Sequence, residues 1–307
     1  MTRVTPVLLL TFLGWGVSGC ASFPARPDTP ALLVWAGKAN NKTNESTADE
    51  KGPQSANPEE PEKTPPEEDA IKTDRPTFTA SSTTVGKDHV QLETGYTFTR
   101  VQPNVDTHSF PEANLRFGLC GDWLEGRIGQ NVMALSPDGQ GSVDSQIGAQ
   151  DLLLGVKIAL TKQKDLMPES AVIVQTSVPT GSPSLTQKQA CPGIDYLFSW
   201  ELIKDRLSLN GSFLANRALD PSEHFYIQLG QSLFVDYSLS KKLDAFAEWY
   251  ALYPSGAVDP TTGPTQNVDC GLTYKLTNNC QLDIRVGAGL NSHANDFFTG
   301  AGISVRY

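Results

Sequence analysis

Four histidines are the side chains best suited to acid–base or metal chemistry, and they are scattered as His89, His108, His224 and His293. Two of them adjoin a serine, in the pairs His108–Ser109 and Ser292–His293. A lipid hydrolase such as a phospholipase would need the two side chains to meet. Neighbouring residues of a strand point to opposite faces, so neither pair predicts an enzyme. The scattered histidines and the absence of short cysteine pairs predict no metal site or other cofactor.

Five cysteines are present, and the first has the clearest context. Cys20 follows Val17-Ser18-Gly19 at the end of an apolar run, which resembles a bacterial lipobox, so we expect its thiol to be lipidated. The alternative is ordinary signal-peptidase cleavage, with Cys20 removed. The disulfide state of the other four stays open: Cys191 falls in a predicted loop, Cys270 on an apolar row, and Cys120 and Cys280 at two predicted turns. A bond between the last two is one alternative, although turn order alone does not bring them within bonding distance.

Charged residues recur at alternate positions of the predicted strands, on the faces that carry few apolar side chains. If the apolar faces meet lipid, ten of these charges are candidates for the lining of a lumen: Glu93, Arg116, Glu125, Arg127, Asp151, Lys157, Glu248, Asp269, Asp283 and Arg285. Such charges either select the solutes of a pore or cross-link a polar interior. Because the two signs are interleaved, we expect most of them to form structural networks.

The elements that carry these charges are predicted strands, since apolar residues take every second place from residue 88 onward. Val90, Leu92 and Tyr96 alternate with Gln91 and Glu93 in this way. Counting the weaker runs gives about twelve strands, an even number as in single-chain bacterial barrels. The predicted connections are short on one side of the sheet and mostly long on the other, which is typical of membrane barrels. The sequence therefore predicts an all-β, antiparallel, up-and-down transmembrane barrel over residues 88–307.

The last strand supports this prediction. From Phe297 to Tyr307, mostly apolar side chains occupy every second position, and the chain ends on an aromatic residue. This pattern resembles the C-terminal signal that the barrel-assembly machinery of Gram-negative bacteria recognises in outer-membrane proteins. A soluble edge strand could share the pattern, but a signal peptide at the other end favours the barrel.

Three segments precede the predicted barrel. Residues 1–20 combine an early Arg3 with a short apolar run and small residues, as a secretory signal does, and the run is too short to span a bilayer. Residues 21–72 are rich in Pro, Glu, Asn, Lys and Thr, which predicts a disordered linker in the periplasm. Residues 73–87 have no clear period, and one hypothesis is that they fold into the periplasmic mouth of the barrel as a plug, with Asp74 and Arg75 joining the luminal charges.

The composition narrows the class of protein further. Only 19% of the residues are charged, and 26 glycines and 21 prolines accompany them, which suits many short strands joined by turns. The net charge of −10 and the lack of a basic stripe argue against nucleic acid as a partner.

Several passages resemble an outer-membrane family catalogued as putative MetA-pathway of phenol degradation proteins, often called transporters. The resemblance covers roughly residues 73–307, and its motifs include Thr73-Asp74-Arg75-Pro76-Thr77-Phe78-Thr79, Gln91-Leu92-Glu93-Thr94-Gly95-Tyr96, Asp151-Leu152-Leu153-Leu154-Gly155-Val156-Lys157 and Asp283-Ile284-Arg285-Val286-Gly287. It implies a membrane barrel with a transport role, although no site that would oxidise an aromatic compound is recognisable.

These observations lead to two hypotheses. The first is a passive outer-membrane channel for small solutes, including hydrophobic or aromatic ones, with the lipid bilayer as its other partner. The second is a closed structural or adhesive barrel whose outer loops contact partners. The solute is not visible in the sequence.

Overall fold

The two-residue period produces the strands of the structure, a computed structural model that describes residues 69–101, 105–136 and 146–307. The strands are β1 (Val90–Val101), β2 (Val105–Gly118), β3 (Leu124–Ser136), β4 (Gln146–Ala149), β5 (Leu152–Thr161), β6 (Glu169–Val178), β7 (Cys191–Ile203), β8 (Leu207–Leu219), β9 (Phe225–Ser238), β10 (Leu243–Ser255), β11 (Thr265–Thr277), β12 (Cys280–Gly289) and β13 (Phe297–Arg306). The predicted signal at 1–20, Cys20 and nearly all of the predicted linker lie outside the described residues.

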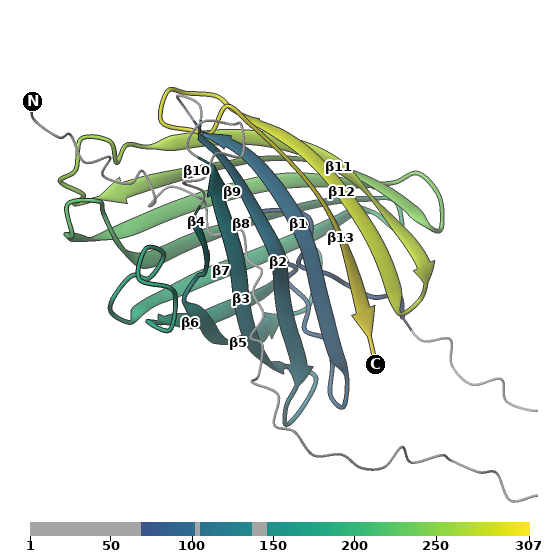
Figure 1. Ribbon diagram of the computed structural model, residues 1–307. Coiled ribbons are helices and arrows are strands. Elements are labelled where there is room, and N and C mark those ends of the chain that lie inside the picture. Colours follow the sequence, from purple (N-terminus) through teal and green to yellow (C-terminus); the bar gives the residue numbers. More distant parts are fainter. Residues whose placement is uncertain (1–68, 102–104, 137–145) are drawn as a thin grey trace, which may run out of the picture. The chain divides into compact units, whose positions relative to one another are not determined.

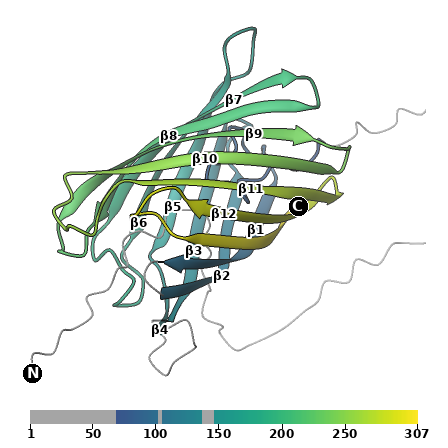
Figure 2. The same cartoon turned by 90° about the horizontal axis from the view of Figure 1, so that it is seen from above.

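The strands close into a barrel. Each strand pairs with its neighbours in antiparallel fashion, and β13 pairs with β1 from Gln91↔Arg306 to Arg100↔Phe297. β4 and β5 both pair with β3, at its two ends, so together they take the place of one strand. The result is a closed antiparallel barrel of twelve strand positions, which confirms the predicted fold (Figure 1). Figure 2 shows the ring from a perpendicular direction, with β2 and β3 opposite β7 and β8.

The barrel is apolar outside and polar inside. In β1, Val90 and Leu92 are exposed while Gln91 and Glu93 are buried, and the same order recurs around the ring. Exposed large side chains on the strands include Tyr96, Leu154, Val174, Ile194, Tyr196, Phe213, Leu229, Leu233, Val268, Leu272, Ile284, Val286 and Ile303. A soluble protein buries such residues, whereas a barrel in a bilayer presents them to lipid.

The connections differ between the two ends of the barrel, as predicted. At the end where β1 begins and β13 ends, here called the terminal end, the connections are 119–123, 162–168, 204–206, 239–242 and 278–279. At the opposite end, here called the loop end, they are 102–104, 137–145, 179–190, 220–224, 256–264 and 290–296. Apart from the longer connection over 162–168, the terminal end carries short turns, and the loop end carries mostly longer connections.

Several details differ from the prediction. One strand is much shorter than the others: β4 has only four residues, Gln146–Ala149, and pairs with the end of β3. Cys191 is not in a loop: it is the first residue of β7 and is buried. Cys120, Cys191, Cys270 and Cys280 are all free, so the disulfide considered between the turns is not formed. Among the described residues, no helix is long and apolar enough to cross a bilayer.

Candidate functional site

The interior of the barrel contains the segment that precedes β1. Within residues 71–85, here called the luminal segment, Ile71, Asp74, Phe78, Thr79 and Val85 are all buried. The segment has no regular secondary structure, so its amides need partners other than a ladder of backbone hydrogen bonds. It begins before residue 73, since the Ile71 amide already donates to the Asn278 carbonyl at 2.7 Å.

Asp74 is the centre of the densest charge cluster. Its Oδ1 accepts hydrogen bonds from the Lys157 ammonium and the Ser81 amide, each at 2.9 Å, and lies 3.4 Å from Arg116 Nη1. Its Oδ2 accepts from Arg127 Nη1 at 2.5 Å. The side chains of Asp74, Arg116 and Lys157 are fully buried. One carboxylate of the luminal segment therefore meets three cations of the barrel wall.

Two carboxylates of the wall complete this cluster, which sits on β1, β2, β3 and β5. Glu93 accepts from the backbone amides of Asp74 and Arg75 at 3.0 Å and from Arg116 Nη1 at 2.7 Å. Glu125 binds the same guanidinium through two bonds of 2.9 Å and also accepts from the Val85 amide. Such paired contacts satisfy charges that would otherwise be costly to bury.

The cations also bind the backbone of the luminal segment. Lys157 donates to the carbonyls of Ser81 and Thr83, and Arg116 donates to those of Lys72 and Thr83. The wall thus supplies acceptors for the amides of the segment and donors for its carbonyls.

Arg75 lies at the seam where the barrel closes. Its guanidinium pairs with Glu112 on β2 at 2.8 Å and with Asp283 on β12 at 3.3 Å, and it donates to the Ala301 carbonyl on β13. Gly95 on β1 and Gly302 on β13 are cross-strand partners beneath it. A Cβ at either position would lie 2.3 or 2.4 Å from the guanidinium, so only glycine leaves room for Arg75.

A second carboxylate binds the segment from the other side of the barrel. Glu248 on β10 accepts from the amides of Phe78 and Thr79 at 2.6 and 2.9 Å, and from the Thr79 hydroxyl. The ring of Phe78 stacks on Tyr250 with centroids 4.4 Å apart and planes 3° from parallel. Asp269 on β11 is the cross-strand partner of Glu248, and neither of its oxygens has a hydrogen-bond partner among the described residues.

The ten predicted luminal residues fall into three groups in the structure. Glu93, Arg116, Glu125, Arg127, Lys157, Glu248 and Asp283 contact the luminal segment, and Arg285 donates to the Pro76 carbonyl at 2.8 Å. Asp269 is buried, and among the described residues it forms no hydrogen bond with the luminal segment.

Asp151 has a different place from the one expected. It lies between β4 and β5, outside any strand, and its two oxygens accept from the amides of Gly181 and Gln187. Its contacts hold the loop over 179–190 and are separate from the cluster around Asp74.

Glu112 is a residue of the site that the sequence analysis missed. It pairs with Arg75 and also accepts from the Thr97 hydroxyl at 2.9 Å. The register between β2 and β3 shifts between Ser109 and Glu112, which interrupts the alternation on which the prediction depended. The spacing of Glu112, Asn114 and Arg116 on one face could have revealed it.

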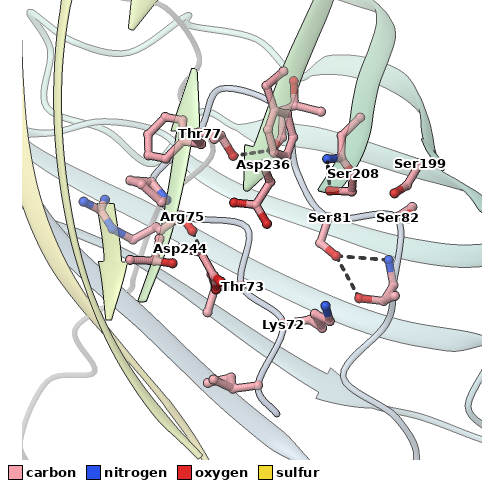
Figure 3. A pocket seen from close by; sticks show the side chains of 18 of the residues that line it. Lys72, Thr73, Arg75, Thr77, Ser81, Ser82, Ser199, Ser208, Asp236 and Asp244 are labelled. Carbon is pink, nitrogen blue, oxygen red and sulfur yellow. Dashed lines mark hydrogen bonds between the residues drawn. The ribbon is translucent and has the colours of Figure 1, made fainter. Parts of the chain in front are cut away.

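Cavities lie on both sides of the luminal segment. The larger, of about 360 Å³, is at the terminal end, and Figure 3 shows Asp236, Asp244 and Ser208 around it with Thr77, Ser81 and Ser82 of the segment. A smaller cavity of about 70 Å³ is at the loop end and is lined by Phe78, Tyr250, Phe298, Met133 and Arg285, among others. The barrel therefore retains open space above and below the segment.

A further group of contacts links three loops at the loop end. The buried Asp220 accepts from the amides of His224, Val258 and Asp259 at 2.9 to 3.1 Å. Burial acts to raise the pKa of this carboxyl, but the three amides outweigh it and hold the pKa below its ordinary value. The side chains of Lys188 and Glu223 form an ion pair beside it.

His108 and Ser109 lie on opposite faces of β2. His108 is exposed and bonds to the Tyr96 hydroxyl at 2.8 Å, whereas Ser109 is buried on the inner face. Within the described residues, no three His, Cys, Asp or Glu side chains converge as metal ligands.

Comparison with known proteins places this architecture in a family. The model of the family described as "Putative MetA-pathway of phenol degradation" matches residues 73–307, which include the luminal segment from Thr73 and all the strands. The chain belongs to this family. No curated protein matches the chain.

Three solved structures that resemble the chain are distant from it in sequence. A structure of the NanC porin has a TM-score of 0.46 at 11% identity and covers 70% of this chain and 98% of that chain. The KdgM porin has a TM-score of 0.44 at 10% identity, with the same coverage. The CymD monoaromatic hydrocarbon channel has a TM-score of 0.37 at 9% identity and covers 71% of this chain and 87% of that chain.

Proposed function

We propose that this member of the family is an outer-membrane channel for the passive uptake or efflux of small solutes. The observation that carries the proposal is the pair of cavities that flank the luminal segment inside a closed barrel with an apolar exterior. A barrel of eight strands is filled by its own side chains, whereas one of twelve is wider. The space that remains is suited to a narrow passage for solutes.

The luminal segment is the plug of this channel. Its contacts with the wall are mostly hydrogen bonds and ion pairs, such as those of Asp74 and Glu93, and only Ala80 and Phe78 pack into small apolar clusters. Hydrogen bonds of this kind can be exchanged for contacts with water or a solute, whereas each buried ion pair that breaks adds a larger cost. The plug can therefore shift without exposing a large apolar surface.

The aromatic side chains at the loop end bear on the class of solute. Phe78, Tyr250 and Phe298 line the smaller cavity together with Arg285, whose guanidinium lies 5.5 Å from the centre of the Phe298 ring. An apolar wall with a few polar groups suits a small solute with an apolar part. Aromatic compounds such as phenol, which the description of the family names, are solutes of this kind.

The location follows from the same proposal. The apolar exterior requires a bilayer, and the aromatic C-terminal residue Tyr307 suits recognition by the barrel-assembly machinery. Residues 1–20 would direct export, and Cys20 would carry a lipid in the outer membrane. The linker predicted over 21–72 would occupy the periplasm only up to residue 70, because Ile71 and Lys72 belong to the luminal segment.

A non-conducting structural barrel is the second candidate. The ion pairs around Asp74 favour it, because buried charges that are so completely paired give the segment little reason to leave.

Conductance in planar bilayers tests the proposal. The full chain should form reproducible small channels, and deletion of residues 73–84 should enlarge their conductance. A folded protein that remains silent in both forms would support the structural barrel instead. Equal conductance of the two forms would support the channel but contradict the role of the luminal segment as its plug.

A further inference from the structure

The charges inside the barrel are divided between two halves of the wall. On β1, β2, β3, β5 and β12, the carboxylates face Arg116, Arg127, Lys157 and the Arg75 of the luminal segment, and most are paired. The inner face of β6 to β11 instead carries seven carboxylates: Glu169, Asp195, Glu201, Asp236, Asp244, Glu248 and Asp269. Lys275 supplies a positive charge on that side, 2.7 Å from Asp244.

Several of these carboxylates lack the partners that buried charges need. Asp195, Asp244 and Asp269 are 5 to 6% exposed, and each has at least one buried oxygen without a hydrogen-bond partner among the described residues. Asp236 is half-buried, and no hydrogen bond or ion pair joins its carboxyl to another described residue. A buried carboxylate oxygen without a partner is costly, and a proton, a water molecule or a bound cation relieves that cost.

The cavity at the terminal end gives such a cation a place to bind. Asp236 lies directly opposite Ser208 on β8 and Phe246 on β10, and Phe234 precedes it by two residues on the same face. Asp244 lies two residues before Phe246. Both carboxylates, both rings and Ser208 line the cavity of about 360 Å³. Figure 3 shows Asp236, Asp244 and Ser208 around it.

The remaining charges of the lining do not cancel this acidity. Arg75 is paired with Glu112 and Asp283, and Lys275 with Asp244. The groups left are Glu169, which accepts from the Ser82 hydroxyl, the exposed Glu201, Asp236 and the Lys72 ammonium. The lining therefore retains a surplus of negative charge.

We infer that the terminal-end cavity is a binding site for small organic cations of the ammonium type, and that the passage prefers cations to anions. Carboxylates attract the positive charge, and the aromatic rings of Phe234 and Phe246 in the lining suit a cation–π contact with an ammonium group. This inference rests on the proposed channel and specifies that its preferred solutes carry a positive charge.

Reversal potentials in a gradient of KCl across a planar bilayer test the inference, with tetramethylammonium chloride as the probe of the site. The wild-type channel should prefer potassium to chloride, and millimolar tetramethylammonium should reduce its potassium current. Asp236→Asn should lower the permeability ratio of potassium to chloride about threefold or more, since a unit charge about 6 Å from the ion acts even through water. Lys72→Gln should raise the ratio, because its side chain adds positive charge to the same lining.

Asp165→Asn is the matched control, since Asp165 is exposed in the turn over 162–168 and its left-handed backbone tolerates asparagine. It should leave selectivity and block unchanged. The cation site would be contradicted by a wild-type channel that prefers chloride, or by selectivity and block that are unchanged in Asp236→Asn. Either result would still be consistent with the proposed channel. A protein that is silent both with and without residues 73–84 would overturn the channel and this inference together.

Discussion

Removing the charge of Asp74 should release the luminal segment. The carboxylate meets Arg116, Arg127 and Lys157 in a region without solvent exposure. Asp74→Asn keeps the size of the side chain and an oxygen that can still accept from the Ser81 amide and Lys157. What is lost is the charge that the three cations share.

The magnitude follows from the cost of leaving buried charges unpaired. Breaking a buried ion pair by removing one partner costs about 3–5 kcal/mol. We expect the lower end, about 3 kcal/mol, because Glu125 still pairs with Arg116 and Arg127. Since about 1.4 kcal/mol corresponds to a factor of ten, the population with the segment displaced should rise roughly a hundredfold.

Thiol labelling measures that population. Ala80 is 3% exposed and packs against Ala171, Ile173 and Leu197, so a cysteine there is shielded while the segment is in place. The peptide from Thr73 to Lys87 contains no natural cysteine and no bond that trypsin cleaves readily, because Arg75 precedes proline. Mass spectrometry of this peptide therefore reports the labelling of Ala80→Cys alone.

The rate of labelling should rise steeply when Asp74→Asn is added to Ala80→Cys, and it should not change when Asp165→Asn is added. Equal rates in the presence and absence of Asp74→Asn, in protein that is folded by its heat-modifiable electrophoretic mobility, would refute the assigned role of Asp74 in holding the segment.

Three other outcomes are expected. Phe78→Ala should also speed the labelling of Ala80→Cys, because it removes the stacking on Tyr250 and a buried ring worth about 3 kcal/mol, whereas an unchanged rate would contradict the packing. The protection of the Val258 and Asp259 amides against hydrogen exchange, measured relative to the intrinsic exchange rate at each pH, should be high at neutral pH. It should fall as the pH drops through the lowered pKa of Asp220, since stability that comes from a depressed pKa is lost on protonation, and with Asp220→Asn this pH dependence should disappear. Cys20→Ser should abolish incorporation of labelled palmitate into the protein, and persistent labelling would exclude this cysteine as the lipid attachment site.

The fold could be predicted from the sequence because a membrane barrel has a strict two-residue period. The alternation of Val90, Leu92 and Tyr96 with Gln91 and Glu93 reappears in the structure as exposed and buried positions. The period fails where the luminal segment covers the inner face. Ile173 points into the lumen, although it is apolar, because Ala80 packs on it. That contact cannot be predicted from the alternation within a single strand.

The pairing of the charges was beyond the sequence for a similar reason. The alternation indicates that Glu93 and Glu248 face inward, but both bind backbone amides of a segment that has no period of its own. Asp151 shows the converse: the heptapeptide Asp151–Lys157 reads as one strand, yet the strand begins at Leu152, and Asp151 binds loop amides instead. Partners far apart in sequence decide which charges form the site.

The glycine pair beneath Arg75 has a consequence for the order of biogenesis. Gly95 belongs to the first strand and Gly302 to the last, so the seat of the guanidinium does not exist until the two ends of the barrel have joined. The contacts of Arg75 with Asp283 and Ala301 likewise depend on the final two strands. Arg75 leaves the ribosome before any strand of the barrel, but it reaches its final position only after the last strand has been made. A truncated or unclosed barrel lacks the binding site of the Arg75 guanidinium, so Arg75 reaches its native contacts only in a completely closed barrel.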